Sequence, residues 1–238
     1  MACLQPTLAS AIANMMADAD LYHRLEMSLP APWIDHTDRA YAWNVRRLLS
    51  FAVDQYNDAV AACQLFEPIT FNLQRNTSGH VSESEDEQFK NRLRGISARA
   101  YVYALDMTCT FVEDLRDQPL NTPPAIAACT TFLQRFQAAL RLIRNSLAHV
   151  DARFQGVGYG DKKLPGPVIV VGGDFKAPNR FGVTSGDGRY AEVEISEQVL
   201  NYLRSALLEI IWSFEWIVIG NTRARRPERS QTVEDAEL

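Results

Sequence analysis

The sequence lacks the cysteine spacings that mark metal-binding and disulfide-rich proteins. Its four cysteines, Cys3, Cys63, Cys109 and Cys129, are dispersed, with no Cys-x-x-Cys pair and no histidine close by. A structural zinc site needs closely spaced ligand pairs, and a small disulfide scaffold needs a much denser cysteine pattern. We therefore expect reduced thiols, three of them on the apolar sides of helices, and neither a metal nor any other cofactor.

Long hydrophobic runs are also missing. The most apolar stretch, residues 207–219, contains Glu209 and Glu215 and is shorter than the roughly 20 apolar residues that a membrane-spanning helix needs. The first residues carry no basic cluster and include Asp18 and Asp20, which is not the pattern of a signal peptide. These features favour a cytoplasmic protein that has no membrane partner.

Lysine is scarce, and the net charge is negative. Only four of the 24 basic residues are lysine, the other 20 are arginine, and the formal net charge is −5. A negative chain excludes a broad electrostatic footprint for duplex nucleic acid, although it leaves room for a local basic site. Because the guanidinium group matches phosphate oxygens in shape, such a site would be built from arginine.

The composition that remains is that of a globular protein with a real core. Hydrophobic residues make up 47% of the 238 residues and charged residues 22%, which favours one domain over residues 1–220. Residues 221–238 are charged and nearly free of apolar side chains, so we expect a disordered tail. The 3.6-residue period of apolar positions predicts helices at about 7–28, 37–65, 84–116, 122–149 and 196–220, with a loop over 66–83.

A short β insertion is predicted at about residues 165–195, before the last helix. Glycine and proline in residues 155–167 exclude a helix there. Three short apolar stretches follow, with a tight turn at 185–188, and we expect strands at 168–171, 181–184 and 190–195. An antiparallel meander of such short strands should tolerate shortening. The predicted fold class is therefore mainly α, a helical bundle with this insertion.

One histidine closes a predicted helix in a pattern suited to phosphate chemistry. Residues 142–149 read Leu-Ile-Arg-Asn-Ser-Leu-Ala-His, which places Arg144 and Asn145 shortly before His149. A histidine titrates near neutral pH and can act as base or acid. Arginine offers a fixed fork of donors to phosphate oxygens. RNA can be cleaved without a metal by such a pair, because the base activates the 2′-hydroxyl and the cation stabilises the charge that develops on the phosphate.

This motif resembles the signature of the HEPN superfamily, in which an arginine, a polar residue that is often asparagine, and a histidine four to six residues after the arginine lie at the end of a long helix. The resemblance covers residues 37–150 and the last helix, but not the β insertion. It implies a HEPN-like bundle and a metal-independent endoribonuclease whose site forms across a homodimer, with RNA as substrate. It further implies a toxin or a defence or stress effector with a cognate inhibitor or partner protein.

The resemblance assigns catalytic roles to Arg144, Asn145 and His149. On an ideal helix a five-residue offset separates two side chains by about 140°, so Arg144 and His149 can face one point only if the helix ends between them. A two-fold dimer would bring two motifs together, and Arg141 and Arg153 would then add substrate-binding charge, making six guanidinium groups in one cleft. Asn145 would orient His149 or bridge to the other protomer.

A second segment has the same spacing. Arg75 and Asn76 precede His80 as Arg144 and Asn145 precede His149. We interpret this segment as a decoy, because it falls in the predicted Ser/Gly loop, where neither side chain would be preorganised.

Three alternatives stay open. Arg144 can instead pair with a carboxylate at the edge of the core, such as Asp114, while His149 complements the negative end of its helix dipole. The chain can be a non-catalytic HEPN-fold module that holds RNA or a protein partner on the same dimer face. More distantly, it can be a structural phage or host factor. Loss of RNA cleavage on changing His149 separates the enzyme from the binding module.

Overall fold

The structure, a computed structural model, describes residues 33–76, 85–149, 173–185 and 188–217. In these ranges the chain is mainly helical, as predicted, with a three-stranded antiparallel sheet before the last helix. None of the described helices has the length and apolar character needed to cross a membrane. The elements are β1 (Trp33–Ile34), α2 (Arg39–Asn76), α3 (Glu85–Arg116), α4 (Pro123–Ala148), β2 (Asp174–Ala177), β3 (Arg180–Thr184), β4 (Tyr190–Glu194), α6 (Glu197–Trp212) and β5 (Trp216–Ile217).

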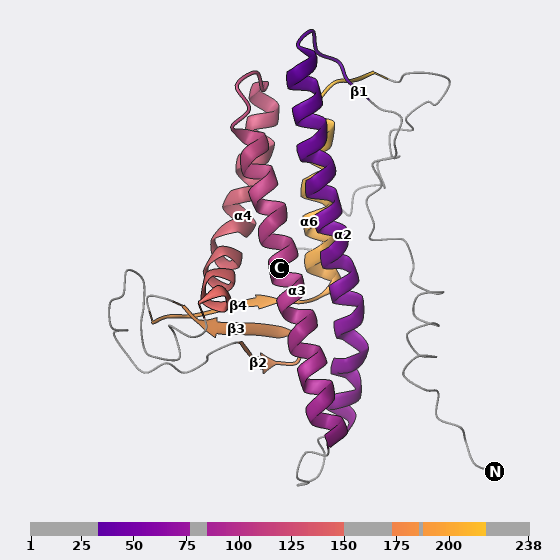
Figure 1. Ribbon diagram of the computed structural model, residues 1–238, viewed down its shortest axis with the longest axis vertical. Coiled ribbons are helices and arrows are strands. Elements are labelled where there is room, and N and C mark those ends of the chain that lie inside the picture. The colour runs from indigo at the N-terminus through magenta and orange to yellow at the C-terminus, as the bar shows by residue number, and fades with distance from the viewer. Residues whose placement is uncertain (1–32, 77–84, 150–172, 186–187, 218–238) are drawn as a thin grey trace, which may run out of the picture.

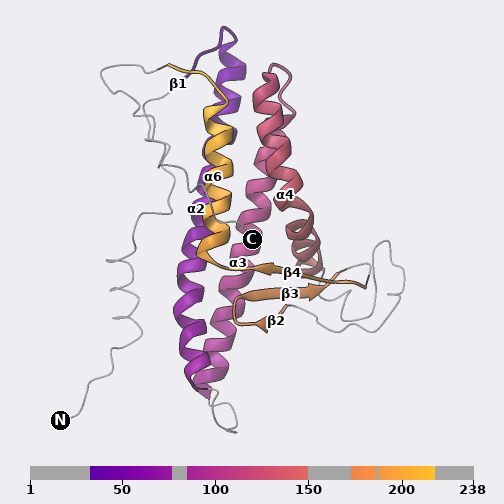
Figure 2. The same ribbon diagram turned by 180° about the vertical axis from the view of Figure 1, so that it is seen from behind.

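The long helices α2 and α3 form an antiparallel pair that determines the length of the molecule (Figure 1). Helix α4 packs along α3. Helix α6 packs against α2 and α4, on the side of the bundle that faces the viewer in Figure 2. Most of the predicted apolar positions of α2 are buried, because a 3.6-residue period places them on one side of the helix. The buried ones are Val45, Leu48, Leu49, Ala52, Val53, Tyr56 and Val60.

The sheet β2–β3–β4 contributes to the core, so the expectation that its meander tolerates shortening stays a prediction and applies least to β3. Phe181 and Val183 of β3 and the following Ile195 are almost completely buried. The Ser146 hydroxyl of α4 donates to the Thr184 carbonyl oxygen at 2.9 Å. Strands β3 and β4 both contact α4, so side chains of the sheet complete the core beside that helix.

One basic side chain ties the sheet to the long helices. Arg94 of α3 lies 3.7 Å from the ring centroid of Phe175 in β2 and donates to the Pro178 carbonyl oxygen. Phe175 in turn packs on Phe66 of α2, with ring centroids 5.5 Å apart. A cation over an aromatic ring adds to the stability of this contact, and the three elements are held together by it.

Helix starts agree with their sequence signals. Thr122 stands before Pro123 at the start of α4, a common pattern for a helix start, although its side chain makes no capping hydrogen bond. The Ser196 side chain accepts from the Val199 amide at 3.3 Å and caps α6. Strand β2 was not predicted. The helix expected at 7–28, the strand expected at 168–171 and the tail at 221–238 lie outside the described residues.

Two helix ends differ from the prediction. Helix α2 continues through Pro68 to Asn76, where the composition predicted a loop, because packing against α3 outweighs the cost of an interior proline. Arg75 and Asn76 therefore lie in the last turn of a helix, and the predicted loop setting of the decoy segment was wrong for them. Helix α6 ends at Trp212 instead of near residue 220, since β5 turns back to pair with β1.

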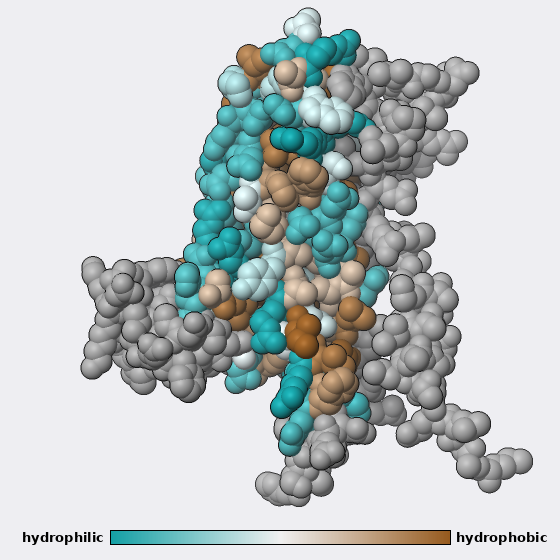
Figure 3. Space-filling model, viewed as in Figure 1, coloured by the Kyte–Doolittle hydropathy of each residue, from teal (hydrophilic) through white to brown (hydrophobic). Residues whose placement is uncertain are grey.

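Several large apolar residues are exposed, among them Phe89 and Ile96, which the sequence pattern places in the interior stripe of the helix predicted at 84–116. They are Trp43 (50%), Phe89 (56%), Ile96 (56%) and Ile126 (41%). Brown and tan residues form a band down the middle of the face that α3 presents in Figure 3. Helix α3 thus carries more apolar surface than its contact with the core uses.

Candidate functional site

Helix α4 positions the predicted motif at the edge of the core. Its inner side is buried, and Arg141, Arg144 and Asn145 fall beside that side, each partly exposed. The residues that anchor the helix are Ala125, Cys129, Phe132, Leu133, Leu140, Ile143, Ser146 and Leu147. Because these anchors surround the motif in sequence, the helix backbone under Arg144 is held from both sides.

The helix ends immediately before the histidine. Helix α4 stops at Ala148, and His149 is its C-cap residue, with φ −120° and ψ 41°. The His149 amide donates to the Ser146 carbonyl oxygen at 3.3 Å, which closes the last turn, and His149 is exposed. The predicted helix end is confirmed. Since His149 has left helical geometry, its side chain is no longer bound to the 140° offset from Arg144.

Arg144 is held by a buried carboxylate. Its Nε donates to Asp106 Oδ2 of α3 at 2.9 Å, and its Nη1 donates to Asn145 Oδ1 at 2.9 Å. The Asp106 side chain is 1% exposed, while that of Arg144 is 37% exposed. A buried charge needs a partner, so this pair determines where the guanidinium lies. The alternative partner considered from the sequence, Asp114, lies two helical turns further along α3.

The Asp106 carboxylate is not fully used. Its Oδ1 is buried and has no hydrogen-bond donor in the described part of the chain. Arg144 is held by Asp106 through Nε and by Asn145 through Nη1, and its side chain is 37% exposed. A guanidinium that is held in this way and is partly exposed is suited to meet an anion from solvent.

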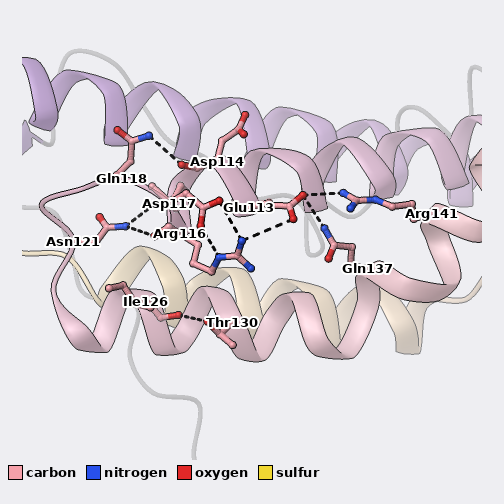
Figure 4. A network of polar contacts seen from close by, with 11 residues as sticks. Glu113, Asp114, Arg116, Asp117, Gln118, Asn121, Ile126, Thr130, Gln137 and Arg141 are labelled. Atoms are coloured by element: carbon pink, nitrogen blue, oxygen red, sulfur yellow. Dashed lines mark hydrogen bonds and ion pairs between the residues drawn. The ribbon is translucent and has the colours of Figure 1, made fainter.

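Arg141 belongs to a separate network on the surface (Figure 4). Its Nη2 donates to Glu113 Oε2 at 2.8 Å, and Gln137 Nε2 donates to the same oxygen at 3.0 Å. The hydrogen bond from Arg141 is the main reason that the pKa of Glu113 lies below its usual range. Arg116 joins the network through Asp117 at 2.8 Å and Glu113 at 3.8 Å.

Neither of the two predicted substrate-binding arginines, Arg141 and Arg153, is shown with a free guanidinium group. Arg141 was predicted to bind substrate, and in the structure its Nη2 is already bound to Glu113. Arg153, the other predicted substrate-binding residue, lies outside the described residues, as does His80.

His36 lies before α2, where its Nδ1 accepts from the Asp38 amide at 3.0 Å and its ring packs on Tyr41.

Asp106 is the residue that sequence reasoning missed. The sequence held a signal for it, because Asp106 is an acidic residue among the buried positions of α3, which include Tyr101, Leu105 and Cys109. Aspartate is almost never fully buried without a partner, so an acidic residue among core positions indicates a cation on a neighbouring element. The sequence alone did not show that α4 supplies this cation.

Other reactive groups are poorly placed for chemistry. Cys63, Cys109 and Cys129 are free and buried, as predicted. Burial, helped by the nearby Asp106, raises the pKa of Cys109 to about 12, so the nucleophilic thiolate is scarce at neutral pH. In the described ranges no group of three or more His, Cys, Asp or Glu side chains is arranged to hold a metal ion.

The end of α4 therefore combines an arginine held by a buried carboxylate with an exposed histidine five residues later, where the helix has ended. No family model matches the chain, and comparisons with curated proteins and with solved structures found no significant similarity.

Proposed function

We propose that this protein is a metal-independent endoribonuclease of the HEPN type that acts as a homodimer, as a toxin or as a defence or stress effector. One observation carries the proposal. Arg144 is held by the buried Asp106 carboxylate, and His149 is exposed five residues later, where α4 has just ended. This arrangement supports a role for Arg144 as a preorganised phosphate-binding group and for His149 as the group that transfers protons.

The reaction follows from these two groups. His149 takes the proton of a 2′-hydroxyl, and the 2′-oxygen attacks the adjacent phosphorus. The bond from phosphorus to the 5′-oxygen breaks, that oxygen takes a proton from water, and the protonated His149 returns its proton to the resulting hydroxide. The products are a 2′,3′-cyclic phosphate and a 5′-hydroxyl. Arg144 stabilises the charge on the phosphate oxygens. Asp106 and Asn145 act through Arg144 as positioning residues. Arg141 and Arg153 would bind flanking phosphates, Arg141 by exchanging Glu113 for an anion.

A second function is favoured by the contacts of Arg144 itself. Its guanidinium is shared between Asp106 and Asn145, and the carboxylate offsets part of its charge. A non-catalytic module that holds RNA or a protein partner on the same face needs no more than this. The two functions differ in what His149 does, because binding survives its removal and cleavage does not.

The test compares His149→Ala with wild type on a mixed single-stranded RNA. We expect cleavage to fall by about 10²–10⁴-fold, with little change in unfolding temperature because His149 is exposed. The matched control is His80→Ala, which has the same motif spacing and should cleave as wild type. Cleavage should persist in EDTA and leave cyclic phosphate ends. Normal cleavage by His149→Ala, or cleavage that stops in EDTA, would contradict the proposal.

Arg144 needs a different design, because removing it alone leaves Asp106 buried without a cation. We therefore propose the double change Asp106→Leu with Arg144→Met, which replaces the pair by apolar groups of similar size. This variant should fold and should not cleave RNA. If the wild type cuts no RNA, and RNA binding survives in His149→Ala but is lost in this double variant, the binding module replaces the enzyme.

A further inference from the structure

Helix α3 carries a second apolar stripe on the side that faces away from its core residues. The spacing along this stripe alternates between four and three residues, which is the heptad spacing of helices that pack on one another. We call it the α3 stripe. Its members are Phe89, Leu93, Ile96, Ala100, Tyr103 and Met107.

The α3 stripe is open to solvent among the described residues. Phe89 and Ile96 are each 56% exposed and Tyr103 is 39% exposed, while Ala100 is exposed and Leu93 and Met107 are partly exposed. At about 1.5 Å per residue the stripe is about 27 Å long, and such contiguous apolar surface marks an interaction site.

We propose that a second copy of this chain packs on the α3 stripe, with the two α3 helices antiparallel about a two-fold axis level with Tyr101 and Val102. In this register Ala100 lies opposite Tyr103 of the partner subunit, so a small side chain faces a large one. Ile96 lies opposite Met107 of the partner subunit. The central part of the stripe, from Ile96 to Met107, is therefore complementary to itself, as a two-fold interface requires.

Charge at the edge of the stripe favours the antiparallel direction. Arg92 and Asp114 are both exposed and lie toward opposite ends of α3. In the antiparallel register Arg92 comes close to Asp114 and Glu113 of the partner subunit, which are of opposite charge. A parallel pair would place Arg92 beside Arg92 and Tyr103 against Tyr103. Complementary charge at an interface sets both partner and orientation.

The same axis brings the two helix ends together. Gln137 contacts Glu113 and Arg144 contacts Asp106. Helices α3 and α4 are therefore antiparallel here, and each step forward along α4 corresponds to an equal step back along α3. Five residues further on, His149 is level with Tyr101, which is the height of the axis. A two-fold axis perpendicular to α3 keeps both α4 helices on the same side of the α3 pair. Both motifs then line one edge of the interface, a link that rests on the proposed function.

The first test measures the mass of the full chain in solution by light scattering at micromolar concentration. Wild type should be a dimer. Ile96→Glu should weaken the dimer by about 30-fold or more, because an interface anchor is lost, and should keep the fold since Ile96 is exposed. The matched control is Ile126→Glu on α4, which is also exposed and should remain dimeric. A monomeric wild type, or a dimeric Ile96→Glu, would overturn the proposal.

Crosslinking tests the direction. In the antiparallel register the two Ala100 positions are separated by only three residues along the helices, within reach of a short bis-maleimide across packed helices. The two Phe89 positions are about 37 Å apart. In a Cys3→Ser background, where the remaining natural cysteines, Cys63, Cys109 and Cys129, are buried, Ala100→Cys should therefore crosslink and Phe89→Cys should not. Efficient crosslinking of Phe89→Cys would show a parallel pair instead.

These measurements separate the interface from the enzyme. If wild type dimerises as described and no RNA is cut, the interface stands and the proposed function fails. If His149→Ala abolishes cleavage while Ile96→Glu remains dimeric and active, the function stands and the interface is wrong.

Discussion

Two arginine–carboxylate pairs join α3 and α4, and they differ mainly in burial. Arg144 meets Asp106 at 2.9 Å and Arg141 meets Glu113 at 2.8 Å, yet the carboxylates are 1% and 31% exposed. An exposed pair contributes little to stability because water and salt screen it. A buried pair is costly to break, since its remaining charge stays in the core. Although the two distances are similar, burial of Asp106 fixes the position of Arg144, whereas Arg141 can exchange Glu113 for another anion.

The largest expected effect is that of Arg144→Ala. We expect the free energy of unfolding at pH 7 to fall by about 3 kcal/mol, because Asp106 remains buried without its cation. Urea denaturation measures this directly. The double variant with Asp106→Leu and Arg144→Met should recover most of the loss. If Arg144→Ala were as stable as wild type, burial would not be the reason for the difference between the two pairs.

The next effect tests burial without charge. Ser146→Ala removes the hydroxyl that donates to the Thr184 carbonyl oxygen, and both groups are buried. We expect a loss of about 1 kcal/mol, measured in the same way, because the Thr184 carbonyl oxygen loses a buried hydrogen bond. Ser205→Ala is the control, since its hydroxyl is on an exposed helix surface and should change stability little. Equal effects in both variants would contradict this account.

A smaller effect is expected for the exposed pair. Arg141→Ala should lower the free energy of unfolding by less than about 1 kcal/mol, and the difference from wild type should shrink as salt is added. Denaturation at low and high salt checks this. A loss as large as that of Arg144→Ala would mean that the surface network, including Gln137 and Arg116, acts as one cooperative unit.

The smallest effect is a dependence on pH. The pKa of Glu113 is lowered, first of all by the hydrogen bond from Arg141. A depressed carboxyl pKa stabilises the fold above the unfolded value of about 4.3, and this contribution is lost as the pH falls through the folded pKa. The stability difference between wild type and Glu113→Gln should therefore be present at pH 7 and fade below about pH 4. A difference that grows on acidification would reverse the assigned sign.

Local chemistry explains what could be predicted about the fold. Proline after Thr122 and the serine at 196 favour helix starts through groups only a few residues apart. The apolar period predicted the long helices and most of the core. It could not say which of two apolar sides of α3 faces inward, so Phe89 and Ile96 were assigned to the interior wrongly.

The candidate site divides in the same way. The amino-acid sequence by itself determined the spacing of Arg144, Asn145 and His149 and the end of the helix that carries them. Only the tertiary structure decided that Asp106 holds Arg144, that Glu113 holds Arg141 and that α2 continues through Pro68. The first set depends on neighbours within one or two helical turns. The second depends on contacts between separate elements, whose free energy outweighs local preference and is not written in any single stretch of the chain.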